Sequence, residues 1–266
     1  MNVKEILNSY YSNYDEDGRL LSRHGQVEFL TTMRYIRRYL REGARVLEIG
    51  AGTGRYSHAI ARMGHPVDAV ELIEHNVELF RRNTRPGERV SITQGDATRL
   101  DGIADETYDV TLLLGPMYHL FDNELRIAAL SEAVRVTKRG GVVFAAYVGN
   151  DACVAQFVFG RNMINTEPYT KLVDRETFAC ASEPGEIFAL YRRGDVDALM
   201  TELSAKYNVE RLHYVGTDMF SHYMRDALAE MDDETFRTFM DYHFVICERA
   251  DMVGISNHIL DVFTRK

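Results

Sequence analysis

The chain has few of the residues that cross-link or stiffen small proteins, with three cysteines and five prolines among 266 residues. It also has no tryptophan. Cys153, Cys180 and Cys247 lie far apart and form no CxxC pair, which argues against a disulfide framework and against a structural zinc site. A chain of this length buries a full apolar core without such links. We therefore expect no metal site and a protein of the reducing cytosol.

Long apolar runs and an excess of positive charge are also missing. The sequence has no run of about 18 apolar residues, so it predicts no membrane span. The formal net charge of −9 disfavours bulk binding to nucleic acid or to an anionic membrane. The acidic and aromatic N-terminal stretch is typical of neither a signal peptide nor a transit peptide. These absences favour a cytoplasmic protein and leave its oligomeric state open.

What the sequence does contain is an alternation of helix and strand patterns. Apolar residues at helical spacing, beside an arginine-rich face, predict a helix over 24–41. Short β-rich runs follow, separated by helical patterns, at 45–49, 67–72, 90–93, 108–114 and 142–148. Later strands are expected at 187–191, 212–216 and 258–264. This alternation predicts an α/β fold with a doubly wound, mostly parallel sheet.

The same pattern suggests three regions. Residues 1–40 form an N-terminal helical arm, and residues 41–150 form the regular core of the sheet. Residues 151–266 complete the sheet and carry two helical insertions, 150–185 and 219–255, which we expect to cap the ligand edge. The alternative is a separate C-terminal helical domain.

The strongest local signal is a glycine loop between a strand and a helix. It contains Gly50, Ala51, Gly52 and Gly54, and Glu48 comes two residues before it. Glycines permit positive φ and a close approach of backbone to ligand, and the following helix offers free N–H groups. A dinucleotide site reads GxGxxG, whereas this loop reads GxGxG. Glu48 would repel a diphosphate and attract a ligand that carries an ammonium group.

Two further acids follow the next strands. Glu71 ends the second strand, where a carboxylate suits the two hydroxyls of a ribose. Asp96 follows the third strand; it can accept from an adenine amine while Ala97 lets the backbone reach the ring. Leu72 and Leu114 end the second and fourth predicted strands and are also expected to line this site. Each acid alone reads as a solvated loop residue, but three at successive strand ends predict a nucleoside site.

These segments together resemble the class I S-adenosylmethionine-dependent methyltransferases. The resemblance covers residues 40–150 and is carried by VLEIGAGTGRYS, the acid of VDAVEL, the GDA triplet, YDVTLLLG and VTKRGGVVFAAYV. It implies a Rossmann-like, seven-stranded sheet whose last strand is antiparallel. It also implies S-adenosylmethionine as cofactor, with the Gly50–Gly54 loop at the methionine moiety, Glu71 at the ribose and Asp96 at the adenine.

The resemblance places the chemistry just after the fourth strand. Methyl transfer from a sulfonium mainly needs alignment and exclusion of water, with a base only where the nucleophile loses a proton. Amino-group methyltransferases usually carry a D/N-P-P-Y type tetrad here, but this chain has Gly115 and Met117 in two of those positions. His119 is the candidate base and Tyr118 the ring beside the methyl group. The alternative for His119 is a structural histidine.

The N-terminal arm is expected to act as a lid. Aromatic faces attract cations such as a sulfonium, so we expect Tyr11 and Tyr14 nearest the methyl donor, with Arg19 at the cofactor. Tyr11, Tyr118 and His119 are then the expected substrate contacts. The alternative is an arm that packs on its own domain.

The leading interpretation is a methyltransferase that acts on a small-molecule nucleophile by SN2 displacement. The alternatives are an RNA or protein methyltransferase and a non-catalytic S-adenosylmethionine-binding protein.

Overall fold

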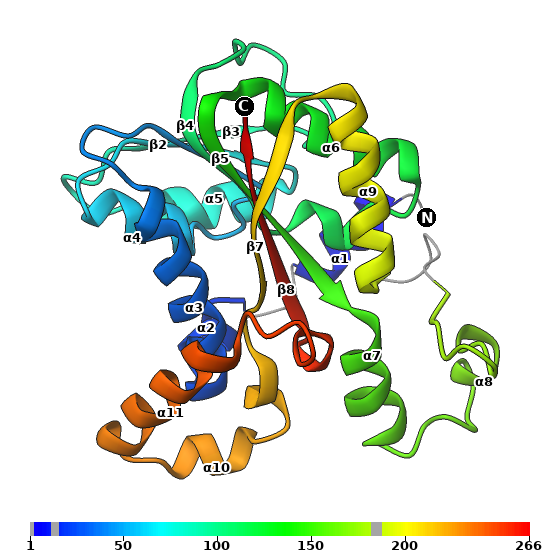
Figure 1. The fold of residues 1–266 in the computed structure, drawn as a ribbon. Coiled ribbons are helices and arrows are strands. Elements are labelled where there is room, and N and C mark those ends of the chain that lie inside the picture. The colour runs from blue at the N-terminus through cyan, green and yellow to red at the C-terminus, as the bar shows by residue number, and fades with distance from the viewer. Residues whose placement is uncertain (1–2, 12–15, 182–187) are drawn as a thin grey trace.

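The computed structural model describes residues 3–11, 16–181 and 188–266. In this part of the chain, eight strands form one sheet, in the order β3-β2-β1-β4-β5-β8-β7, with β6 paired to β5 off that path (Figure 1). The strands are β1 (Val46–Ile49), β2 (Val67–Glu71), β3 (Val90–Gln94), β4 (Tyr108–Leu113), β5 (Thr137–Gly149), β6 (Leu190–Tyr191), β7 (Val209–Gly216) and β8 (His258–Arg265).

The strand directions confirm the fold class that the sequence predicts. Strands β1 to β5 pair in parallel, and β6 is parallel to β5. The last strand, β8, runs antiparallel to β5 and to β7. Because of this reversal, the first residue of β8, His258, pairs with Val148 near the carboxyl end of β5. The chain order turns back between β1 and β4, the kind of position at which open α/β sheets bind ligands.

Helices cover both faces of the sheet (Figure 1). On one face, α6 (Asn123–Val136) and α9 (Arg193–Lys206) share an apolar core with β5 and β8. On the other face, α3 (Arg23–Tyr39) and α4 (Arg55–Arg62) pack on the same strands and on β1. Helix α5 (Glu74–Asn83) buries Phe80 against Ala69 of β2. Helices alternate with strands along the chain, as predicted, and these helices bury apolar side chains on the sheet.

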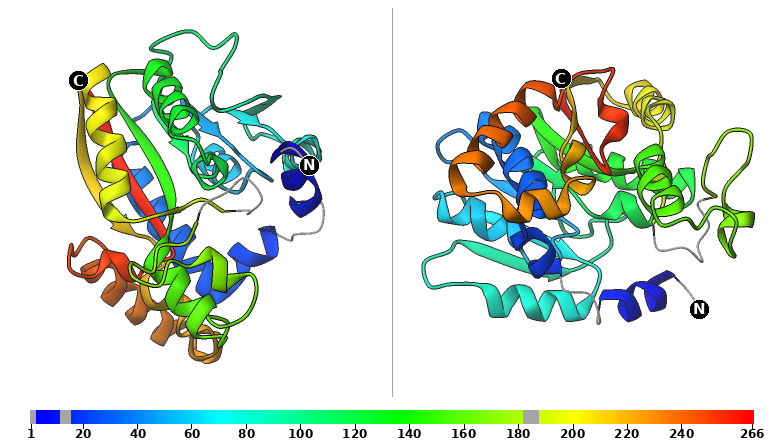
Figure 2. Two further views of the ribbon diagram at one scale, coloured as in Figure 1. Left: turned by 90° about the vertical axis from the view of Figure 1, so that its right-hand side faces the viewer. Right: turned by 90° about the horizontal axis from the view of Figure 1, so that it is seen from below.

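The remaining elements lie around the ligand edge and below α3. They are α1 (Val3–Tyr11), α2 (Glu16–Leu21), η1 (Pro116–His119), α7 (Asn150–Cys153), η2 (Val154–Phe159), α8 (Tyr169–Leu172), η3 (Met219–His222), α10 (Arg225–Glu230), α11 (Asp233–Ile246) and η4 (Val253–Ile255). Val27 of α3 packs with Leu228, Phe236 and Met240 of α10 and α11. Helix α1 contacts α5 (Figure 2). None of the described helices is long and apolar enough to cross a membrane.

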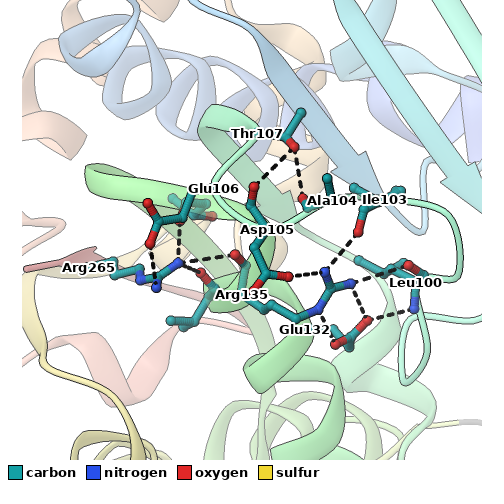
Figure 3. Close-up of polar contacts among 11 residues, drawn as sticks. Leu100, Ile103, Ala104, Asp105, Glu106, Thr107, Glu132, Arg135 and Arg265 are labelled. Atoms are coloured by element: carbon teal, nitrogen blue, oxygen red, sulfur yellow. Dashed lines mark hydrogen bonds and ion pairs between the residues drawn. The ribbon is translucent and has the colours of Figure 1, made fainter.

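Two arginines hold the connection from β3 to β4, which carries Asp96 (Figure 3). Arg135 donates to the backbone oxygens of Leu100 and Ile103 and to the carboxylates of Asp105 and Glu132. Arg265 of β8 donates to Glu106 and to carbonyls at the end of α6. The connection is therefore tied to α6 and β8 by many charge-assisted hydrogen bonds.

Candidate functional site

A cavity of about 940 Å³ opens at the carboxyl edge of β1, β2 and β4. This volume is near the upper end of the range for small-molecule sites. We call one part of it the glycine-loop end; it is lined by Glu48, Gly50–Gly52, Glu71 and Asp96. We call the other part the histidine end; it is lined by Tyr11, His119, His222 and His258.

The three glycines of the loop all have positive φ but serve different purposes. A Cβ on Gly50 would lie 2.5 Å from the ring of Pro116, and one on Gly54 would lie 2.5 Å from the ring of Phe80. A Cβ on Gly52 would meet no described atom within 4 Å. Gly54 is the N-cap of α4 and is not among the residues that line the cavity. Close packing therefore requires Gly50 and Gly54, whereas Gly52 leaves the cavity open.

Glu71 joins the end of β2 to the glycine loop. Its Oε2 accepts from the backbone N–H of Gly52 at 2.8 Å, and its Oε1 accepts from Ile73 N–H at 2.8 Å. Burial raises the pKa of this carboxyl, although these hydrogen bonds oppose the shift. Glu71 thus orients the loop, a role that the sequence analysis did not include beside the expected ribose contact.

Glu48 lies buried where β1 enters the loop. Its Oε2 accepts from the backbone N–H of Ser57 at 2.9 Å and from the Ser57 hydroxyl. Burial raises the pKa of Glu48 to about 7. Ser57 stands in the first turn of α4, so the carboxylate caps that helix in addition to lining the cavity.

Asp96 is exposed at the rim. Its Oδ1 accepts from the N–H of Thr98 at 2.8 Å and from the Thr98 hydroxyl at 2.7 Å. Ala97, Ala51, Leu72 and Leu114 also line the cavity. The structure therefore brings together all the expected cofactor contacts that it describes, except Gly54.

At the histidine end, the arm meets the segment after β4. The hydroxyl of Tyr11 lies 2.8 Å from Nε2 of His119, and the His119 ring lies 5.6 Å from the ring of Phe188. Tyr118 lines the cavity beside His119. Tyr14 lies outside the described residues, and so does the side chain of Arg19, so their expected contacts stay predictions.

The main polar cluster of this end was not predicted from the sequence. Nδ1 of His258 lies 2.6 Å from the buried carboxylate of Asp218, and Nε2 of His222 lies 3.2 Å from the same oxygen. Glu28 of α3 approaches His258 to 3.4 Å. Forty positions separate Asp218 from His258, so no local motif links them. The one feature of the sequence that pointed to this cluster was the expected antiparallel last strand, whose first residue lies at the ligand edge.

A family model described as "Methyltransferase domain" matches residues 46–141. A ubiquinone biosynthesis O-methyltransferase from Methylocella silvestris is 29% identical over 66% of this chain and 70% of its own length. An S-adenosyl-L-methionine-dependent Diels-Alderase from Talaromyces variabilis is 33% identical over 37% of this chain and 34% of its own. The chain spans about half the length of several other curated relatives that it matches.

Solved structures share the fold at low identity. A SAM-dependent methyltransferase from Thermotoga maritima, described as a possible histamine N-methyltransferase, has a TM-score of 0.57 at 18% identity, over 99% of this chain and 98% of its own. The [4+2]-cyclase SpnF has a TM-score of 0.54 at 18% identity, over 90% and 80% of the two chains. At this identity the likeness establishes the fold alone.

Proposed function

We propose that this chain, which belongs to the class I S-adenosylmethionine-dependent methyltransferases, enzymes that use S-adenosylmethionine as cofactor, transfers a methyl group to a small-molecule nucleophile. The observation that carries the proposal is the continuous cavity. It joins a glycine loop suited to the cofactor to a histidine-bearing end suited to an acceptor.

The cofactor spans the glycine-loop end. Gly50, Ala51 and Gly52 face its methionine moiety, and Glu48 attracts the ammonium group. Glu71 accepts from the ribose hydroxyls. The adenine lies between Leu72, Asp96, Ala97 and Leu114. Support comes from the shared lining of one cavity and from the hydrogen bond that joins Glu71 to the loop.

The acceptor occupies the histidine end, to whose wall we assign five aromatic side chains of the cavity lining. They are Tyr10, Tyr11, Tyr118, Phe157 and Phe188. Such a wall favours a flat, largely apolar molecule over an RNA strand or a protein segment, and the chain's net charge of −9 weighs in the same direction. Tyr118 flanks the transferring methyl group, and Tyr11 with His119 closes the end against water.

The experiment combines calorimetry with methyl-labelled S-adenosylmethionine. We expect binding of the cofactor and of S-adenosylhomocysteine, no binding of NAD, and label transferred to a component of a cytoplasmic metabolite extract. Label in bulk RNA or protein instead would favour the macromolecular alternative. Binding without any transfer would favour a non-catalytic or cyclase-type role, as in the relatives named for cyclisation. A cytoplasmic location stays a prediction.

A further inference from the structure

A chain of hydrogen bonds in the C-terminal half of the protein runs along the cavity, which Arg225, His222 and His258 all line. It begins at Arg225, whose Nη2 lies 2.6 Å from Nδ1 of His222. A guanidinium only donates, so Nδ1 of His222 accepts and its proton is on Nε2. That Nε2–H points to Oδ2 of Asp218, 3.2 Å away.

The carboxylate of Asp218 is fully buried and held on every side. Oδ1 accepts from the hydroxyl of Ser256 at 2.5 Å and from the backbone N–H of His258 at 3.1 Å. Oδ2 accepts from Nδ1 of His258 at 2.6 Å. Burial alone would raise the pKa of Asp218, but His258 and His222 hold it well below its usual value. Asp218 is thus an oriented anion beside His258.

His258 stands between this anion and the cavity. It lines the cavity, whereas Asp218 does not, and its ring lies 6.0 Å from that of Tyr118. The antiparallel direction of β8 places its first residue at the edge where β1 and β4 end. Since Nδ1 donates to Asp218, the basic lone pair of a neutral His258 is on Nε2.

We propose that His258 is the general base of the reaction, that Asp218 is its positioning residue, and that the acceptor is a weakly acidic hydroxyl on a planar ring. This inference rests on the proposed function. The hydroxyl oxygen attacks the methyl carbon as the C–S bond breaks toward sulfur. Its proton passes to Nε2 of His258. The products are a methyl ether, S-adenosylhomocysteine and an imidazolium paired with Asp218.

The acceptor class follows from the need for a base. A thiolate or an amine free base attacks a sulfonium without prior help, whereas a phenol-like hydroxyl is a poor nucleophile until it loses its proton. Glu28 places a second carboxylate oxygen 3.4 Å from Nδ1 of His258, the same ring nitrogen that Asp218 contacts. The aromatic wall described above accepts the ring of such an acceptor.

A metal site is the competing interpretation of this cluster. Ligand atoms of Asp218, His222 and His258 lie within 4.8 Å of one another. The hydrogen bond from Arg225 argues against it, because it leaves Nε2 of His222 protonated and puts a guanidinium beside the site. Metal analysis of the purified protein is therefore part of the test.

The experiment uses labelled S-adenosylmethionine with phenol, 4-chlorophenol, 2-naphthol and 4-nitrophenol as acceptors. We expect His258→Ala to slow transfer to phenol by about 100-fold to 10,000-fold, the usual contribution of a general base. The loss should shrink strongly for 4-nitrophenol, because a substantial fraction of it is already ionised near neutral pH. Asp218→Asn should show the same dependence on acceptor acidity. Cofactor affinity of His258→Ala should match that of the wild type.

His213→Ala is the matched control. His213 also pairs with a carboxylate, Glu248 at 3.0 Å, but it is not among the lining residues of the cavity, so its rate should be unchanged. The inference is overturned if His258→Ala keeps the wild-type rate on phenol or loses rate equally on all four acceptors. It is also overturned if a bound metal is lost in that variant, or if a wild type that binds cofactor methylates none of the phenols. Absence of cofactor binding would instead overturn the proposed function.

Discussion

The two ends of the cavity are built in opposite ways. The glycine-loop end comes from residues 48–97, a continuous stretch whose strand ends follow one another along the chain. The histidine end collects side chains from α1, α3, η1, η3 and β8, elements from all parts of the chain. The cofactor has a constant shape, which a local motif can bind. The acceptor is variable, and its end of the cavity is formed by side chains from distant parts of the chain.

The largest expected effect is at the glycine-loop end. Gly52→Val should weaken S-adenosylmethionine binding by about 100-fold or more, because the side chain enters the open space beside the loop. It also strains a residue with φ of +54°, at a cost of about 1–2 kcal/mol. Gly102→Val is the control: φ is +80° and its Cβ also meets no described atom within 4 Å, but the residue is not among those lining the cavity. Calorimetry that found equal affinities for the two variants would contradict the loop assignment.

Glu71→Ala should be the next most damaging change. Loss of charge-assisted hydrogen bonds, each worth about 1.5–3 kcal/mol, predicts an affinity at least about tenfold weaker. The loop also loses its bond from Gly52 to the carboxylate, so Glu71→Gln should retain part of the affinity. Glu78→Ala, at an exposed position on α5, is the matched control. An unchanged dissociation constant for Glu71→Ala would count against the ribose contact.

At the histidine end, Tyr11→Phe should have a moderate effect on rate and almost none on cofactor binding. It removes the hydroxyl that lies 2.8 Å from His119, and a neutral hydrogen bond contributes about 0.5–1.5 kcal/mol, or about twofold to tenfold. Tyr242→Phe, at an exposed site on α11, is the control. Steady-state turnover reports on the histidine end, and calorimetry with the cofactor reports on the glycine-loop end. If Tyr11→Phe weakened cofactor binding and left turnover normal, the assignment of Tyr11 to the acceptor end would be wrong.

The smallest effect concerns pH at Glu48. Because burial raises its pKa to about 7, its ionised fraction, and with it the affinity for the ammonium of the cofactor, should rise about threefold between about pH 6.5 and 7.5. Folding stability changes in the opposite direction. The raised pKa of Glu48 stabilises the folded protein fully at a pH below the ordinary pKa of 4.5, and this stabilisation is lost as pH rises through about 7. Glu48→Gln should therefore be more stable than the wild type at about pH 8, and should lose the pH dependence of binding. Titrations of both proteins across this range, with thermal melts, give the comparison.

Most of the fold was predictable from the sequence. Period-two and period-3.6 patterns give the strands of the core and the helices between them, and the resemblance gives the antiparallel last strand. That Gly52, Glu71 and Asp96 line one cavity could also be predicted, because they stand at fixed offsets from strand ends. The second roles of Glu71 and Glu48, which orient the loop and cap α4, were missed because they depend on hydrogen-bond geometry.

By itself, the sequence determined the sheet, the glycine loop and the acids at the strand ends. The physical reason is that hydrophobic periodicity and the need for glycine at positive φ depend on residues that are close together in the sequence. Tertiary structure alone decided that Arg225, His222, Asp218 and His258 form one chain of hydrogen bonds and that it ends beside Tyr118. The physical reason is the reversal of β8. An antiparallel strand returns its first residue to the edge where the parallel strands end, and no pattern within 218–258 reveals which side chains that edge will bring together.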